Sequence, residues 1–288
     1  MNPKLGLQLW SVRNALQEDY VGTLEKVAAI GYRNLELITT VTDQGLIFGN
    51  DLTATQLLQH LTDKGLQAVS CHIVPGPDTK WDRVVGDLQT LGVKHLGCAI
   101  AFFDNQQEVL RFCNTFNRDA EVCKKNGIQY YYHNHFHEFQ LFEGQSIMDT
   151  MIEKLDEDLV KFEFDSYWAM RGGQDPVAWI QKFGERCGLL HQKDMPAETQ
   201  PVNLFEQFPA DRVVGMTELI ESTKGDDQFT EVGKGMMDVP AIIDAARKYA
   251  QVPYLFVEQD KSSNGELESI AISYTYLAPL LEGQAQEQ

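Results

Sequence analysis

Apolar residues along this chain recur with two spacings, and the two spacings alternate. Short, almost continuous apolar segments such as LELI and VSCHIV are typical of strands buried in a sheet. Each is followed by a longer segment with apolar residues three or four positions apart, which indicates an amphipathic helix. The predicted strands are residues 5–10, 34–38, 66–74, 93–100, 128–135, 160–165, 188–193 and 254–258.

The predicted helices begin and end at residues that favour helix ends. Thr53 is a good N-cap, and Pro176 suits the first helical position. Gly31 and Gly65 follow the last apolar residue of their segments, where glycine commonly ends a helix. The predicted helices are residues 21–30, 53–64, 78–91, 105–126, 146–155, 175–183, 239–249 and 266–281.

This order of elements predicts the fold. Strands that alternate with helices form a parallel sheet, and eight such units close into a (β/α)₈ TIM barrel. We therefore expect an α/β protein with one barrel domain over residues 1–288. A doubly wound open sheet is the alternative, but LQLWSVR follows the first strand where a dinucleotide-binding sheet has GxGxxG.

One segment breaks the alternation. Residues 194–238 show weak periodicity and contain Pro196, Pro201 and Pro209. Loops of this length inside a compact domain are usually functional. We expect this segment to be an insertion after the seventh strand, on the active-site face of the barrel.

Charge and composition narrow the function classes. The chain has 42 acidic and 24 basic residues, a net charge of −18, which disfavours binding to nucleic acid. No apolar run approaches the roughly 18 residues of a membrane helix. The five cysteines include no CxxC pair, so reduced thiols in a cytoplasmic protein are expected.

Polar residues gather where the predicted strands end. In a barrel the C-terminal ends of the strands form the active site, so these side chains should meet. Histidine and carboxylate together favour a divalent metal: Mn²⁺, Co²⁺, Zn²⁺, Fe²⁺ or Mg²⁺. The residues at strand ends are Gln8, Trp10, Glu36, His72, His133, His135, Asp165, His191, Lys193, Asp194, Glu258 and Asp260.

Several spaced motifs carry a resemblance to a known family. They include LGLQLWSVRNAL, YYHNHFHEF, FDSYWAMRGGQDP, LLHQKDM, FTEVGKGMMDVPAI and FVEQD. In this order they resemble the xylose isomerase-like TIM barrels, a superfamily of sugar phosphate isomerases and epimerases that also includes inosose dehydratases and ketose 3-epimerases. The resemblance covers nearly the whole chain.

The resemblance implies a set of metal ligands. The family usually takes Glu, Asp, His and Glu from strands five to eight, and Asp165, His191 and Glu258 match the last three. Strand five has a histidine pair where glutamate is typical, so we assign His133 as the ligand and direct His135 at the substrate. Which of the two histidines is the ligand stays open. Trp168 stands where some members carry another histidine.

The resemblance also implies a reaction class and a small sugar or polyol as substrate. Family 3-epimerases use two glutamates on opposite faces of the substrate, and the strand-five histidine makes that arrangement doubtful here. We expect His135 or Glu258 to abstract a proton beside a carbonyl, with Lys193 offsetting oxyanion charge. Residues expected to contact substrate are Glu36, His72, Trp10, Trp168 and Arg171.

Dehydration of a keto-inositol or 3-keto sugar is the preferred reaction, with ketose isomerisation or 3-epimerisation as the alternative. A non-catalytic sugar-binding barrel is the alternative from another class, and it predicts a broken set of metal ligands. The family often forms dimers or tetramers, so a homo-oligomer is also expected.

Overall fold

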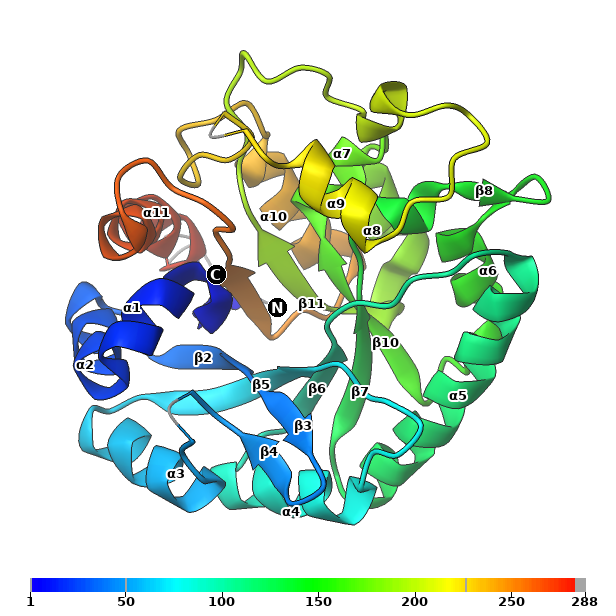
Figure 1. Cartoon of the computed structure of the whole chain (residues 1–288). Coiled ribbons are helices and arrows are strands. Elements are labelled where there is room, and N and C mark those ends of the chain that lie inside the picture. Colours follow the sequence, from blue (N-terminus) through cyan, green and yellow to red (C-terminus); the bar gives the residue numbers. More distant parts are fainter. Residues whose placement is uncertain (1, 50, 226, 283–288) are drawn as a thin grey trace.

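The computed structural model describes residues 2–49, 51–225 and 227–282. Within this part of the chain, eight parallel strands close into a barrel (Figure 1). The last strand pairs with the first, with Leu5 opposite Leu255, which confirms the barrel and rules out the open sheet. In barrel order the strands are β1 (Lys4–Gln8), β2 (Asn34–Ile38), β5 (Gln67–Ile73), β6 (His95–Cys98), β7 (Gln129–His133), β10 (Val160–Asp165), β11 (Cys187–Gln192) and β12 (Tyr254–Val257).

Helices form a ring around the barrel (Figure 1), and their apolar faces pack on the strands. Thr53 and Gln56 form a reciprocal capping box at the start of one of them. The helices are α1 (Arg13–Glu18), α2 (Tyr20–Ile30), α3 (Ala54–Asp63), α4 (Trp81–Leu91), α5 (Gln106–Lys125), α6 (Ile147–Lys154), α7 (Ser166–Arg171), α8 (Pro176–Phe183), α9 (Met216–Ser222), α10 (Val239–Tyr249) and α11 (Glu266–Glu282).

Short hairpins and 3₁₀ helices lie outside the barrel sheet, and the apolar pattern did not predict them. Two hairpins, β3 (Thr40–Thr42) with β4 (Gly45–Ile47) and β8 (Leu141–Phe142) with β9 (Gln145–Ser146), lie outside the barrel. Short 3₁₀ helices occur as well. They are η1 (Leu9–Val12), η2 (His137–Phe139), η3 (Gly184–Arg186) and η4 (Leu204–Gln207).

Five of the barrel strands, β1, β5, β6, β7 and β12, are shorter than predicted. At the ends of β1 and β7, side chains redirect the backbone. The Gln8 side chain accepts a hydrogen bond from Trp10 N at 3.0 Å, and the chain turns into η1. His135 N donates to Glu138 Oε2 at 2.9 Å after β7 has ended at His133. His135 therefore lies in a turn, and strand alternation does not decide where its ring points.

The segment after β11 contains η4 and α9, and one carboxylate holds its end in place. Asp194 is buried and accepts hydrogen bonds from four backbone N–H groups. The donors are Met195, Gly233, Gly235 and Met237, at 2.8 to 3.1 Å. This carboxylate ties the return of the segment to the end of β11.

The five cysteines are all buried and carry free thiols. Among the described helices, none combines the length and the apolar character needed to cross a bilayer.

Candidate metal centre and active site

Four barrel strands bring the predicted metal ligands together. His133 ends β7, Asp165 ends β10, His191 lies near the end of β11, and Glu258 directly follows β12. All four are buried, and one ligand atom from each lies within 4.8 Å of the others. His133 Nε2 is 3.5 Å from Asp165 Oδ2 and 4.0 Å from Glu258 Oε2. The four side chains can surround a single ion.

Two atoms of this set have no hydrogen-bond partner among the described residues, although both are buried: His133 Nε2 and Asp165 Oδ2. Their neighbouring atoms are engaged. Asp165 Oδ1 accepts from Trp168 N at 2.9 Å, and His133 Nδ1 lies 3.2 Å from the Ala99 carbonyl oxygen. That carbonyl favours the proton on Nδ1, so Nε2 presents a lone pair to the centre.

Burying polar atoms without hydrogen bonds costs free energy, and a cation bound between His133 Nε2 and Asp165 Oδ2 would offset this cost. Two imidazole nitrogens and two carboxylate oxygens suit a divalent ion such as Zn²⁺, Mn²⁺, Fe²⁺ or Co²⁺. The donor set therefore fits the expected metal.

His191 connects this centre to a second polar layer beneath it. Its Nδ1 lies 2.9 Å from Glu258 Oε2, and its Nε2 lies 2.7 Å from Glu36 Oε2. With the proton on Nε2 and Glu36 as acceptor, Nδ1 is free to bind an ion. Histidine ligands in metalloproteins commonly donate their other N–H to a carboxylate in this way.

The lower layer, defined here as Glu36, His72, Glu163 and His191, is buried inside the barrel. His72 Nε2 lies 2.6 Å from Glu163 Oε2 and 3.2 Å from Glu36 Oε2. Burial alone would lower the pKa of His191, but Glu163 and Glu36 raise it well above its usual value. Ion binding at Nδ1 would have to displace a proton, a normal feature of histidine ligands.

The strand pairing is irregular next to both buried glutamates of the lower layer. The register shifts between Leu35 and Glu36 in β2 and between Phe162 and Glu163 in β10. Such irregularities re-aim side chains and are common beside active sites. Here they accompany two carboxylates that face the same pair of histidines.

Lys193 places an ammonium group between the carboxylates of the upper centre. Its Nζ contacts Glu258 Oε2 and lies 3.1 Å from Asp260 Oδ2 and 3.4 Å from Asp165 Oδ2. Burial alone would lower the pKa of Lys193, but Asp260, Glu258 and Asp165 raise it above its usual value. Three carboxyl groups thus face one ammonium, and the centre offers more acidic than basic side chains to a bound cation.

A pocket of about 590 Å³ opens above this centre. His72, His133, His135, Glu258 and Asp260 supply polar groups to its lining, and Trp10 and Trp168 line it as well. His135 Nδ1 has no partner among the described residues, and its ring packs against that of Trp168 at a centroid distance of 5.2 Å. Burial, followed by His133 and His137, lowers the pKa of His135 well below its usual value.

Five residues with predicted site roles do not line this pocket, and two of them, Asp165 and His191, belong to the upper centre. Glu36 lies beneath its floor, and Lys193, which is 1% exposed, lies behind Glu258 and Asp260. Arg171 was expected in a loop but is the last residue of α7. Its buried guanidinium donates to Gln228 Oε1 at 2.8 Å, so it braces the long segment after β11.

Glu163 is a site residue that the sequence reasoning missed. It lies two positions before Asp165 in FEFD, and residues two apart on a strand face the same side. That spacing was the available signal. Asn134 was also missed; its side chain accepts from Asp165 N and donates to the Asp165 carbonyl, which joins the ends of β7 and β10.

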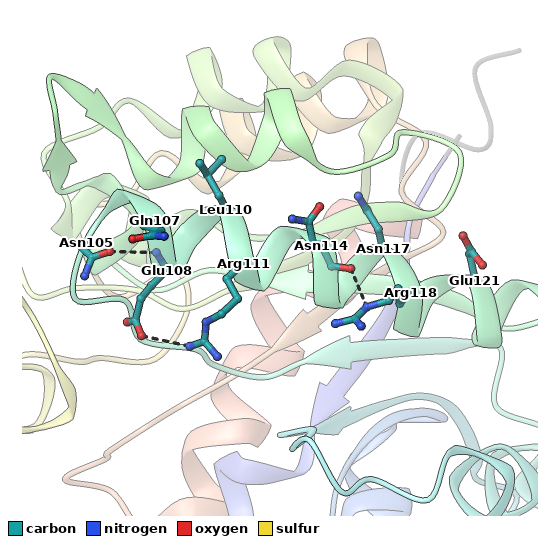
Figure 2. Close-up of a pocket in the computed structure, with 9 residues that line it drawn as sticks. All are labelled: Asn105, Gln107, Glu108, Leu110, Arg111, Asn114, Asn117, Arg118 and Glu121. Atoms are coloured by element: carbon teal, nitrogen blue, oxygen red, sulfur yellow. Dashed lines mark hydrogen bonds and ion pairs between the residues drawn. The ribbon is translucent and has the colours of Figure 1, made fainter.

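A second hollow, of about 890 Å³, lies along α5 (Figure 2). Its side chains pair locally, as in the bond from Arg111 Nη2 to Glu108 Oε1 at 3.1 Å. Arg111 is 66% exposed, so this ion pair is solvated and contributes little. The hollow holds none of the histidine and carboxylate clusters described above.

Comparison with known proteins decides the family. A sequence model described as the xylose isomerase-like TIM barrel matches residues 24–273. This chain belongs to that family. The matched range includes all four candidate ligands of the upper centre.

Individual relatives are more distant. The inosose dehydratase of Geobacillus kaustophilus (strain HTA426) is 26% identical over 162 residues, or 56% of this chain and 46% of the relative. The match thus spans about half the length of that relative. A sugar phosphate isomerase/epimerase structure from Parabacteroides distasonis ATCC 8503 is 26% identical with a TM-score of 0.78, covering 98% of this chain and 96% of the other.

A structure titled as the IOLI protein with a binding zinc atom superposes with a TM-score of 0.66 over 98% of this chain and 99% of the other. At 12% identity it shows a shared fold only.

Proposed function

We propose that this protein is a divalent-metal-dependent lyase that dehydrates a small keto sugar or keto-polyol. One observation carries the proposal: His133, Asp165, His191 and Glu258 converge at a pocket, and among the described residues neither His133 Nε2 nor Asp165 Oδ2 has a hydrogen-bond partner. The similarity to inosose dehydratase supports the choice of dehydration over other chemistry of this fold. We also propose that residues 1–288 act as one domain, with residues 194–238 on the active-site face.

The metal would be held by His133 Nε2, Asp165 Oδ2, His191 Nδ1 and Glu258. When bound, a divalent ion supplies a Lewis acid that polarises a carbonyl and stabilises negative charge on neighbouring oxygens. Glu36 holds the His191 ring by accepting from Nε2 at 2.7 Å. Trp10 and Trp168 would offer apolar surface to the C–H face of a sugar ring.

The reaction begins with loss of a proton from the carbon beside the substrate carbonyl. His135 Nδ1 and the Glu258 carboxylate both belong to residues that line the pocket, and either can accept this proton. The electrons of the C–H bond form a C=C bond to the carbonyl carbon, and the π electrons of the carbonyl group move onto its oxygen, which gives an enolate. As the enolate collapses, the C=O bond re-forms, a C=C bond forms between the α- and β-carbons, and the C–O bond at the β-carbon breaks with release of hydroxide.

The departing hydroxide must gain a proton to leave as water. Lys193 is charged and contacts Glu258 and Asp260, both of which line the pocket. We propose that it offsets the negative charge that develops on the substrate oxygens and supplies the proton through these carboxylates. His72 lines the pocket, and we propose that it contacts a substrate hydroxyl group.

Isomerisation or epimerisation of a ketose is the second candidate. It begins with the same proton abstraction but returns the proton without breaking a C–O bond. The sugar phosphate isomerase/epimerase structure, which this chain covers almost completely, favours this alternative.

The first test is turnover of a substrate panel, with and without added divalent metal. The panel contains myo-inosose, 3-keto-glucosides, free ketoses and hydroxypyruvate, followed by NMR in D₂O. Loss of water with deuterium at the α-carbon is the expected result. Formation of an isomer or epimer without water loss would favour the alternative.

Metal analysis separates an enzyme from a sugar-binding barrel without catalysis. We expect one divalent ion per chain in protein purified without chelator. Protein that takes up no divalent metal would contradict the proposal at its base.

A further inference from the structure

The pocket above the metal centre has a polar floor but largely apolar walls. Ile38, Ile73, Val74 and Ile100 line one side from the ends of β2, β5 and β6, while α9 lines another side. A small polyhydroxylated sugar has little apolar surface to match such walls. The walls indicate that the substrate carries more than a sugar ring.

The large apolar side chains at this pocket are also unusually exposed. Val74 is 58% exposed, Ile220 54%, Met216 49% and Trp10 42%. Among the described residues, these four account for more than half of the large exposed apolar side chains. Exposed apolar side chains that gather in one place mark a binding surface.

The volume of the pocket leaves room for a second group. At about 590 Å³ the pocket lies within the range of roughly 300–1,000 Å³ that is typical of sites for drug-sized ligands, which are larger than a hexose. Aromatic rings contribute to the lining through Trp10, Trp168 and Phe229. Such rings pack well against another flat ring.

We propose that the substrate is a keto sugar bearing an aromatic substituent, and that this substituent packs on the apolar wall that α9 forms in the pocket. The inference rests on the proposed function, because it assumes that the sugar ring sits over the metal centre. It adds a specificity site: α9 selects the aromatic substituent, while the polar residues of the metal centre act on the sugar ring.

The test compares phenyl and methyl β-D-glucoside, which differ only in the substituent. Calorimetric binding of both to the full chain needs no turnover. We expect the phenyl glucoside to bind at least about tenfold more tightly, because its ring is removed from water. The same ratio should appear in kcat/KM for the 3-keto forms of the two glucosides.

Variants locate the preference. Ile220→Gln and Met216→Gln, both at exposed positions of α9, should each lower the phenyl-to-methyl ratio at least threefold. Leu141→Gln is the matched control, because Leu141 is 66% exposed and lies on β8, away from the pocket. It should leave the ratio unchanged.

The outcomes separate this inference from the proposed function. A binding preference without turnover of either keto glucoside keeps the aromatic subsite and rejects the reaction. Equal turnover of both keto glucosides keeps the reaction and rejects the subsite. Equal binding of both glucosides, or a ratio that neither α9 variant changes, overturns the inference. A variant that dissociates an oligomer without changing the ratio would show that a second copy covers the wall, and would overturn it too.

Discussion

Replacing Asp194 by asparagine should loosen the return of the long segment after β11. The Asp194 carboxylate accepts from Met195 and Met237 through Oδ1 and from Gly233 and Gly235 through Oδ2. An amide has one acceptor oxygen, so two of the four backbone N–H groups lose their partner. The surrounding backbone cannot supply replacements without moving.

The size of the effect follows from this hydrogen-bond count. Hydrogen bonds to charged groups contribute about 1.5–3 kcal/mol each. Two lost bonds would therefore cost about 3–6 kcal/mol if the segment stayed closed. Local opening lets water satisfy the freed groups, so about 3 kcal/mol is the expected loss in the free energy of unfolding.

Urea denaturation followed by fluorescence measures this loss, and limited proteolysis shows whether residues 194–238 open first. Asp238→Asn is the control, because Asp238 caps α10 through one backbone N–H, that of Ala241 at 3.1 Å. That variant should lose about 1 kcal/mol or less. If Asp194→Asn loses no more than Asp238→Asn and the segment resists protease equally, the four bonds do not hold it.

Three further predictions follow from the metal centre and the barrel. Removal of divalent metal with a chelator should lower the melting temperature of the wild type but not of His133→Ala, measured by calorimetry. Glu36→Gln should weaken metal binding about 10–100-fold with the fold intact, measured by metal titration, because His191 loses its carboxylate acceptor. Burial lowers the pKa of His95 to about 4, so stability should fall as the pH drops from 6.5 towards 4. At 1.36 kcal/mol per pKa unit the loss is up to about 3 kcal/mol, and His95→Gln should remove it in acid denaturation.

Each of these has an outcome that would count against it. Equal chelator effects on wild type and His133→Ala would place the ion elsewhere. Unchanged metal affinity in Glu36→Gln would mean that the hydrogen bond from His191 Nε2 to the Glu36 carboxylate does not contribute to metal binding. For His95 the sign is set by the depressed folded pKa, since the unfolded chain then binds the proton more tightly. Identical acid profiles for wild type and His95→Gln would contradict it.

The chain's own periodicity was enough to predict the barrel. Alternating apolar segments and amphipathic helices are local features, and residues 34–38, 160–165 and 239–249 form elements with the predicted bounds. Local signals also found the helix cap at Thr53. They did not show that β1 and β7 end early, because the turns there depend on side-chain to backbone bonds.

The upper centre was predictable in a similar way. In a closed barrel the strand ends meet, so the histidines and carboxylates at the strand ends were expected to lie close together. The resemblance to the family then selected His133, Asp165, His191 and Glu258 from that larger group. Their convergence in the structure agrees with that expectation, and their role as metal ligands stays a prediction.

Only the tertiary structure decided which of the site side chains face the pocket and which lie deeper inside the barrel. Glu36 and His191 are 155 positions apart, and their contact depends on the register between strands as well as on closure of the sheet. The register shifts beside Glu36 and Glu163, so a strict period of two cannot tell which carboxylate faces the substrate and which lies beneath the floor. The burial of Arg171 and the position of α9 over the pocket likewise depend on contacts between distant segments. A sequence pattern records what each residue prefers locally, whereas these contacts exist only once the strands have closed and paired in register.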